Sequence, residues 1–589
     1  METQTIQPRW QLTDLLADPL DQSIEAALAE LETLISGLEG ERDKMTHQIS
    51  QAHFNEVLQK LEWVNTLMAR LSGYAHLWVS EDTQSQAALN LRDRIDESLV
   101  ALSNRVMFFD IWFKDLPDEI AERLISGSEK NKYFLESLRR FKPYTLSEVE
   151  EQLLNIKDVN GIDALINLYE MITNRFIFNL EVDGEVKSLT RDSLSTYYFS
   201  ASADLRKAAY QEFYRVYTEN ATILAQIYSH RVRDWYAEGV KLRGYSSPIS
   251  ARNLANDVPD EVVETLLAIC RKNAHLFQNY FQLKANWLGM EKLRRYDIYA
   301  PLAESNKEFT FDQATEMVMD SFSQFSPQIA QLARRVFDEH HLDAFPRHGK
   351  RGGAFCSTIC PELTPWVLVN FDGQAQDVPT LAHELGHAVH SMLASEHSIM
   401  CFHPELPLAE TASVFAEMIM TGYLLERETD PAVRQDLMLR TIDDAYINVI
   451  RQSFFTLFER DAHRMLAEGC SFEELAEHYL ANLSEQFGDA VELSDEFKWE
   501  WVAVPHFFNE PFYTYAYSFG QLLVLSLYQQ YRLEGASFIP RFIKILSYGG
   551  SESPTKILSE AGLDITSADF WQGGFDVLNE MLTELIKIA

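Results

Sequence analysis

The sequence predicts a mainly α-helical protein with one small β-sheet next to the helix expected over residues 377–393. Apolar residues recur three and four positions apart through residues 20–240, which is the spacing of one helix face. Between Lys350 and Gly373 the chain changes to small, β-branched and aromatic residues, which are typical of strands. Hydrophobic residues make up 46% of the 589 residues, which excludes a disordered chain.

The helical pattern begins near residue 20 and is interrupted by turn-forming segments such as "SGLEGE" and "FKPYTL". Its first apolar stripe consists of Ile24, Ala27, Leu28, Leu31, Leu34, Ile35 and Leu38. An Asp-Gly pair within "FNLEVDGEVKSLT" predicts a short hairpin. Helical spacing resumes over residues 257–288 and 309–325.

Length and charge limit the class of protein. A chain of 589 residues exceeds one ordinary hydrophobic core, so we expect lobes separated by a cleft. The net charge of -37 repels phosphate backbones and anionic membranes, so we expect neither nucleic acid nor a membrane as a partner. No apolar run approaches the roughly 18 residues of a membrane span, and the first residues lack a secretory signal pattern. Five scattered cysteines fit reduced thiols, and together these features predict a cytoplasmic protein.

Two strand-length runs, at about 353–359 and 366–371, precede the helix expected over residues 377–393. An edge strand beside a metal site can pair with an extended peptide, which makes the backbone of Gly353 and Ala354 a candidate substrate-binding segment. A purely structural hairpin is the alternative.

The segment "DVPTLAHELGHAVHSML" predicts the metal-binding helix, residues 377–393. His383 and His387 lie four positions apart, so both imidazoles project from one helix face. His-Glu-x-x-His on a helix is the pattern in which both histidines bind zinc and the glutamate, here Glu384, acts as general base. Asp377 is expected to cap the helix start, and Gly386 to permit close approach of another backbone. Two core histidines satisfied by hydrogen bonds are the alternative.

A catalytic zinc needs a third protein ligand and an open position. The downstream candidates are His390, Glu396, His403, Glu405, Glu410 and Glu417. His390 follows His387 too closely for tetrahedral geometry, so we assign it to the surroundings of the site or the core. Glu410 stands among apolar neighbours, where coordination would offset the cost of an unpaired carboxylate. Glu417 is placed to orient a ligand histidine through its second ring nitrogen, or alternatively lies on a solvated helix face.

"TLAHELGHAVH" followed by "PLAETASVFAE" resembles the M3 family of zinc metallopeptidases, in particular the oligoendopeptidase F branch. "GAFC", "VNFDG" and "YGGSESP" resemble segments of that branch in the same order. The resemblance implies one Zn²⁺ per chain on His383, His387 and Glu410, with Glu384 as the base. It also implies a zincin-like helical ellipsoid with a deep central cleft, in which an N-terminal helical lobe (1–195) precedes the catalytic domain (196–589).

The resemblance further implies a histidine followed by clustered tyrosines, which "VPHFFNEPFYTYAYSFG" supplies. His506 and Tyr515 are the expected hydrogen-bond donors to the oxyanion, with Tyr513 as the reserve choice and Tyr513 and Tyr517 as substrate-binding residues. A helix is expected from about Phe512. Packing of one or two of these rings in the core is the alternative.

The predicted activity is zinc-dependent hydrolysis of internal bonds in short peptides by a metal-activated water. Two other functions use the same features. One is a zinc carboxypeptidase or dipeptidyl carboxypeptidase, which the products from an end-blocked peptide would reveal. The other is a helical peptide-binding protein with a structural metal, against which the glutamate beside the two histidines argues.

Overall fold

The computed structural model describes residues 9–16, 21–302 and 308–588, and its secondary structure is mainly α-helical, as the sequence predicts. Its contacts divide the chain into two compact units. Unit 1 comprises residues 1–143, 306–427 and 527–563, and unit 2 comprises residues 144–305, 428–526 and 564–589. Both units are assembled from separate stretches of the chain, and neither ends at the expected lobe boundary after residue 195, which stays a prediction.

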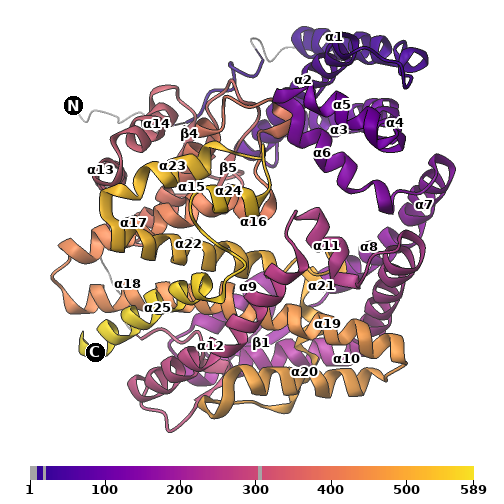
Figure 1. The fold of residues 1–589 in the computed structure, drawn as a ribbon. Helices are drawn as coiled ribbons and strands as arrows, with labels where there is room; N and C mark the ends of the chain where they lie inside the picture. The colour runs from indigo at the N-terminus through magenta and orange to yellow at the C-terminus, as the bar shows by residue number, and fades with distance from the viewer. Residues whose placement is uncertain (1–8, 17–20, 303–307, 589) are drawn as a thin grey trace. The chain divides into compact units, whose positions relative to one another are not determined.

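Unit 1 is built from helices around a three-stranded sheet (Figure 1). Its helices are α1 (Asp21–Glu39), α2 (Gln51–Glu81), α3 (Gln86–Val106), α4 (Phe108–Asp115), α5 (Asp118–Ser126), α6 (Lys132–Arg140), α13 (Phe311–Phe325), α14 (Pro327–Asp338), α15 (Asp377–Leu393), α16 (Leu406–Ala409), α17 (Thr411–Arg427), α23 (Ile539–Ser547) and α24 (Pro554–Glu560). The strands are β4 (Leu342–Asp343), β5 (Phe355–Ser357) and β6 (Trp366–Leu368).

Unit 2 is also helical and carries two short strand pairs. Its helices are α7 (Glu148–Asn160), α8 (Ile162–Asn174), α9 (Arg191–Ser195), α10 (Ala203–Trp235), α11 (Pro248–Ala255), α12 (Asp260–Trp287), α18 (Pro431–Ala445), α19 (Gln452–Glu468), α20 (Phe472–Phe487), α21 (Pro505–Asn509) and α25 (Ala568–Ile588). The strands are β1 (Phe178–Val182), β2 (Glu185–Leu189), β3 (Leu293–Arg294) and β7 (Val491–Glu492). Helix α22 (Tyr515–Glu534) contributes its residues through Ser526 to unit 2 and the remainder to unit 1.

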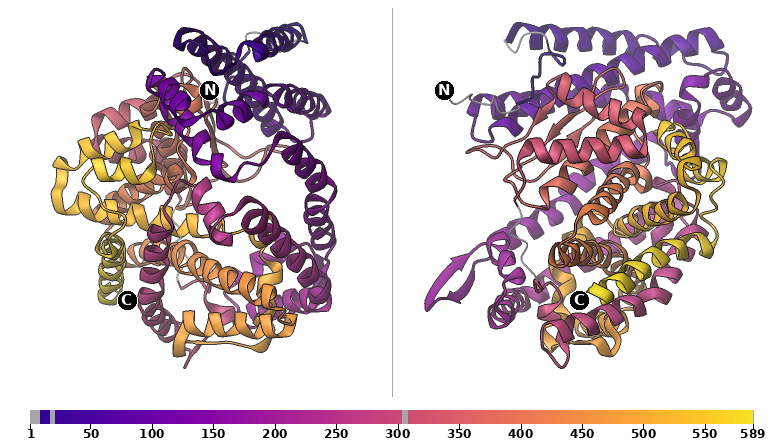
Figure 2. Two further views of the ribbon diagram at one scale, coloured as in Figure 1. Left: turned by 45° about the vertical axis from the view of Figure 1, so that its right-hand side comes forward. Right: turned by 90° about the vertical axis from the view of Figure 1, so that its left-hand side faces the viewer.

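The sequence-predicted hairpin forms as the antiparallel pair β1 and β2, with Phe178 opposite Leu189. Asp183 and Gly184 both have positive φ, 55° and 82°, which is the conformation that an Asp-Gly hairpin turn requires. The right-hand view of Figure 2 shows the paired arrows projecting from the helices of unit 2, and the residues of β2 are largely exposed.

The sheet of unit 1 has the order β4-β6-β5, so β5 is an edge strand, and both β5 and β6 contact α15. Strands β5 and β6 are shorter than the predicted runs at about 353–359 and 366–371, because only three residues of each strand pair with the other. The expected sheet beside the metal helix is therefore present. The described residues also form two strand pairs, the predicted hairpin of β1 and β2 and the unpredicted pair of β3 and β7.

Buried hydrophobic side chains of α1–α6 form a continuous core that reaches the sheet at Trp366 and Leu368. Helix α15 packs against α13, α14 and α17 in the same unit. No helix in the described part of the chain is both long and apolar enough to cross a membrane. The expectation that the chain lacks a secretory signal pattern was drawn from its first residues. Of these, residues 1–8 lie outside the described residues.

Helices α15 and α17 meet at a glycine. A Cβ atom at Gly386 would lie 2.7 Å from the Ala412 carbonyl oxygen and 2.7 Å from Ser413 Cα, which are backbone atoms that cannot rotate away. The expected close approach of another backbone at Gly386 is therefore confirmed. At Gly37 in α1, an added Cβ atom would have no heavy atom within 4 Å apart from the nearby backbone of its own helix. This glycine therefore provides a contrast.

We predict that Gly386→Ala lowers the free energy of unfolding of unit 1 by about 2 kcal/mol or more, because the added methyl group forces the two backbones apart. The matched control, Gly37→Ala, should be neutral or stabilise by up to about 1 kcal/mol, because alanine favours an exposed helix position. Calorimetric unfolding of both variants tests the contact. Equal stability of the two variants would contradict it.

Candidate metal centre and active site

Helix α15 begins at Asp377, as predicted, but its first side chain has a different role from the one expected. Asp377 Oδ2 accepts hydrogen bonds from the backbone N–H groups of Asp372, Gly373 and Gln374 at 3.0, 3.0 and 2.9 Å. Asp377 therefore fixes the turn before the helix, and the prediction that it caps the helix amides is wrong. The turn sets where the helix starts and hence which face carries His383.

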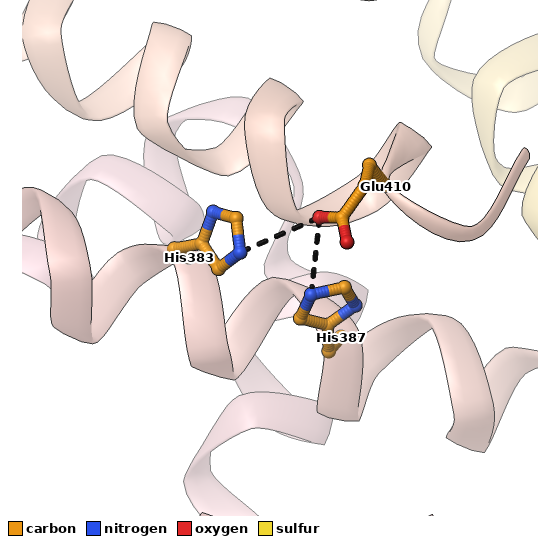
Figure 3. Close-up of side chains that lie close together, drawn as sticks. All are labelled: His383, His387 and Glu410. Carbon is orange, nitrogen blue, oxygen red and sulfur yellow. Dashed lines mark ion pairs between the residues drawn. The ribbon is translucent and has the colours of Figure 1, made fainter. Parts of the chain in front are cut away.

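The two histidines project from one face of α15 and meet Glu410, which lies between α16 and α17 (Figure 3). The His383 and His387 ring centroids are 4.9 Å apart. Glu410 Oε2 lies 3.4 Å from His383 Nε2 and 3.2 Å from His387 Nε2. One ligand atom from each residue lies within 4.8 Å of the others, and two imidazole nitrogens with one carboxylate oxygen are the donor set of a catalytic zinc site.

Hydrogen bonds from neighbouring side chains orient the three candidate ligands. Glu417 Oε1 lies 2.6 Å from His383 Nδ1, so that ring's other nitrogen faces Glu410. Ser413 Oγ donates to Glu410 Oε2 at 2.7 Å. The Glu410 side chain is 48% exposed, so an unpaired carboxylate there costs less than its apolar sequence neighbours suggest. Its position comes from the end of α16 and the bond from Ser413.

The charges around these residues suit a cation. Desolvation would raise the pKa of Glu410, but the hydrogen bond from His387, together with Ser413, lowers it to about 2. Desolvation would lower the pKa of His383, yet Glu417, Glu384 and Glu410 together raise it to about 9. The metal-free cluster thus draws protons onto an imidazole, and a metal ion would displace them because it binds the neutral ring.

Glu384 lies between the two histidines in sequence and is buried. Burial raises its pKa, opposed by the charges of His383 and His387. His390 is also buried, and burial lowers its pKa to about 3, so this ring is neutral and packed on the inner side of α15. Glu396, His403 and Glu405 are not part of the cluster of candidate ligands found among the described residues.

Gly353 and Ala354 lead into the edge strand β5. Gly353 has φ of 79°, and its carbonyl oxygen accepts a hydrogen bond from Asn370 Nδ2 at 2.7 Å. The "YGGSESP" segment, in contrast, is a packed turn, because Gly550 N–H donates to the Cys401 carbonyl at 3.0 Å and Gly549 and Gly550 leave no room for a Cβ atom.

Within unit 2, His506 groups with two of the three tyrosines. The His506 and Tyr513 rings stack with centroids 5.6 Å apart, and the Tyr517 hydroxyl lies 3.3 Å from His506 Nε2. Tyr515 is fully buried, and its hydroxyl accepts a hydrogen bond from Asn256 Nδ2 at 2.8 Å. This burial contradicts the choice of Tyr515 as an oxyanion donor. Helix α22 begins at Tyr515 rather than near Phe512, so Tyr513 lies in the preceding turn.

Sequence reasoning missed Glu459, which holds the loop between His506 and Tyr513. Its fully buried carboxyl group accepts a hydrogen bond from the Phe512 N–H at 3.0 Å. Phe512 has φ of 58°, an uncommon backbone conformation for a bulky residue. The signal available in the sequence was a glutamate that directly follows the largely apolar run "SFFTLF".

Residues 197–577 match the family described as Peptidase family M3, and residues 112–178 match the one described as Oligopeptidase F. The chain belongs to peptidase family M3. It is therefore a metallopeptidase, and the resemblance seen in its motifs is confirmed.

Relatives of this M3 peptidase cover nearly its whole length. It is 26% identical to oligopeptidase PepF of Bacillus subtilis over 98% of this chain and 87% of that protein. It is 27% identical to an oligoendopeptidase F homolog of Borreliella burgdorferi over 91% of each chain.

Two crystal structures show the shared fold of this M3 peptidase. A proposed peptidase from Chlamydophila abortus has a TM-score of 0.89 at 23% identity, with 99% of this chain and 98% of that one covered. Oligoendopeptidase F from Enterococcus faecium has a TM-score of 0.72 at 23% identity, with 96% and 99% covered.

We predict that Glu417→Gln lowers zinc affinity about 10- to 100-fold, because the neutral amide orients His383 less strongly than the carboxylate does. The matched control is Glu426→Gln on the same helix, whose side chain is 77% exposed and should leave affinity unchanged. Competition with a chelator measures both values. Wild-type affinity in Glu417→Gln would show that the 2.6 Å contact does not serve the metal.

Proposed function

We propose that this M3 peptidase is a zinc-dependent oligoendopeptidase that hydrolyses internal bonds of short peptides. The observation that carries the proposal is the meeting of His383, His387 and Glu410 beside the buried carboxyl group of Glu384. The relatives named above, an oligopeptidase and an oligoendopeptidase F homolog, support the class of substrate.

His383, His387 and Glu410 would hold one zinc ion per chain. When bound, the ion acts as a Lewis acid on the peptide carbonyl and lowers the pKa of water at its open position. Glu417 keeps His383 in the required ring orientation, and Ser413 holds the carboxylate of Glu410. Burial of His390 maintains a neutral ring behind the ligands.

Glu384 is the proposed general base. It lies on the same helix as the two histidine ligands, and burial raises the pKa of its carboxyl group, opposed by the charges of His383 and His387. A carboxylate next to the ligands in sequence is suited to proton transfer. Glu384 would accept the proton of the attacking water and deliver it to the leaving nitrogen.

His506 and the tyrosines beside it are the proposed hydrogen-bond donors to the oxyanion. With Tyr515 buried, the role moves to Tyr517, whose hydroxyl is paired with His506, and Tyr513 is kept as a substrate-binding residue. Tyrosine suits this role because its hydroxyl stays protonated near neutral pH. The backbone of Gly353 and Ala354 at the edge strand is proposed to pair with the extended peptide.

The place of action proposed for this peptidase is the cytoplasm, with oligopeptides as its partners. The five cysteines are free thiols, which is the state that a reducing compartment maintains. The charge of -37 makes nucleic acid and anionic membranes poor partners.

We predict that Glu384→Gln keeps bound zinc but lowers kcat for an internally quenched peptide blocked at both ends by about 10²- to 10⁴-fold, because the amide cannot accept the proton. Glu396→Gln, an exposed change just beyond α15, is the control and should retain full activity. Wild-type turnover of Glu384→Gln with zinc bound would overturn the assignment. Activity only on peptides with a free carboxyl end would favour a carboxypeptidase.

We predict that Tyr517→Phe lowers kcat by about 10²- to 10³-fold with little change in KM, because an oxyanion donor acts in the transition state. Tyr515→Phe should keep kcat within a few-fold and lower the melting temperature, because Asn256 loses its buried partner. The reverse pattern, with loss of kcat in Tyr515→Phe alone, would restore the role to Tyr515.

A further inference from the structure

The described part of unit 2 holds two groups in which a pair of arginines shares one carboxylate. In the first, Asp297 binds Arg206 and Arg294, and both arginines also donate to backbone carbonyl groups. Arg206 Nη1 donates to the Ser200 and Ala201 carbonyl groups, and Arg294 Nη2 donates to the Ala203 carbonyl at 3.1 Å. Among the described residues, no buried polar side-chain atom of Arg206, Arg294 or Asp297 lacks a hydrogen-bond partner.

The second group is built around Glu500 and is not satisfied in the same way. Glu500 Oε1 accepts from Arg295 Nη2 at 2.9 Å and from Arg451 Nη2 at 3.0 Å, and Oε2 accepts from the Tyr479 hydroxyl at 3.0 Å. Arg295 Nε and Nη1 and Arg451 Nε are buried without a hydrogen-bond partner among the described residues. The same holds for the hydroxyl of Tyr299, which interacts electrostatically with both arginines.

Aromatic rings account for only part of this environment. The Arg295 guanidinium carbon lies 5.1 Å from the Phe497 ring centroid, 5.7 Å from that of Phe487 and 5.9 Å from that of Tyr210. Such rings stabilise the cation through their faces, but they do not serve as full acceptors for its N–H groups. Buried N–H groups without acceptors are costly, so these donors call for a further acceptor.

The charges decide which acceptor fits. Two guanidinium groups that cannot deprotonate face one carboxylate, so the group carries a net positive charge. Arginine offers only donors, so a ligand with negative charge and acceptor atoms satisfies the site better than water, whose own hydrogens would need acceptors. The Arg451 side chain is 27% exposed and that of Arg295 only 1%, which gives the site an open side and a buried side. Arg451 also ends a π-helical segment, Tyr446–Arg451, a local structure found frequently at functional sites.

We propose that unit 2 binds one small monovalent anion, a halide or a carboxylate group, against Arg451, Arg295 and Tyr299. The site is separate from the candidate metal ligands, all of which belong to unit 1, and the proposal does not depend on the catalytic roles given above. Binding adds the missing negative charge and supplies acceptors to donors that the fold leaves unused.

Thermal unfolding of the full-length protein tests the proposal. Chloride is raised at constant ionic strength against the bulky sulfonate isethionate, and acetate is titrated in a second arm. We expect a saturable increase in melting temperature of about 2–5 °C with chloride, because an anion that binds only the folded state stabilises it. An equal response to acetate would identify a carboxylate as a ligand of the site, and a response to chloride alone would identify an inorganic ion. No saturable response to either anion would overturn the proposal.

Two arginine variants provide a matched comparison, because the side chains of Arg451 and Arg294 are exposed to a similar degree, 27% and 23%. Arg451→Gln should lose the anion response, since Glu500 then balances Arg295 alone. Arg294→Gln, in the satisfied group, should keep it. Retention of the response in Arg451→Gln would contradict the assignment.

Crystals of the unchanged protein soaked in bromide give a readout that does not depend on how the variants fold. We expect an anomalous peak within about 3.5 Å of Arg451 Nε, which is the range of a hydrogen bond to a large anion. Ordered bromide elsewhere with none at this position would contradict the proposal.

Discussion

The metal centre depends on one backbone contact, where α17 crosses α15 at Gly386. The atoms that a side chain at this position would meet belong to Ala412 and Ser413, which follow Glu410 by two and three residues. The contact that packs the helices therefore also sets the distance between the Glu410 carboxylate and the two imidazoles. Ser413 contributes twice, through its backbone at the contact and through the hydroxyl that holds Glu410.

The balance of charge around this contact explains why a divalent cation suits the site. Glu384, Glu410 and Glu417 surround two imidazoles that are neutral when they bind a metal. Without a cation, the three carboxylates favour the protonated form of His383. They also repel one another, because that one proton balances only part of their negative charge. Unit 2 shows the opposite arrangement around Glu500, where two arginines share one carboxylate. The net charge of -37 for the whole chain therefore does not indicate the local balance of charge at the metal centre or around Glu500.

Local patterns predicted the local parts of the structure. Helix α15 runs over Asp377–Leu393 as expected, since apolar spacing and the following break define both ends. The Asp-Gly turn of the hairpin and the glycine at the helix crossing were also predictable, because each has a physical requirement that few residues meet. The choice of Glu410 over nearby acidic residues agrees with the geometry, although its side chain is 48% exposed.

The remaining parts depend on contacts distant in sequence. Tyr513, Tyr515 and Tyr517 alternate, so spacing cannot tell which ring faces the core until the start of α22 is known. The bond from Asn256 to Tyr515 joins residues 259 positions apart, and that from Arg295 to Glu500 joins residues 205 apart. One sequence contains no record of such pairings, which explains why the buried arginines and Glu459 were not singled out.

Diffraction data collected on both sides of the zinc absorption edge, from crystals of the unaltered protein, test the central claim most directly. The account predicts one anomalous peak per chain, about 2.0–2.2 Å from His383 Nε2, His387 Nε2 and a carboxylate oxygen of Glu410. A peak at a different set of side chains, or zinc-supplemented crystals with no peak near α15, would contradict it.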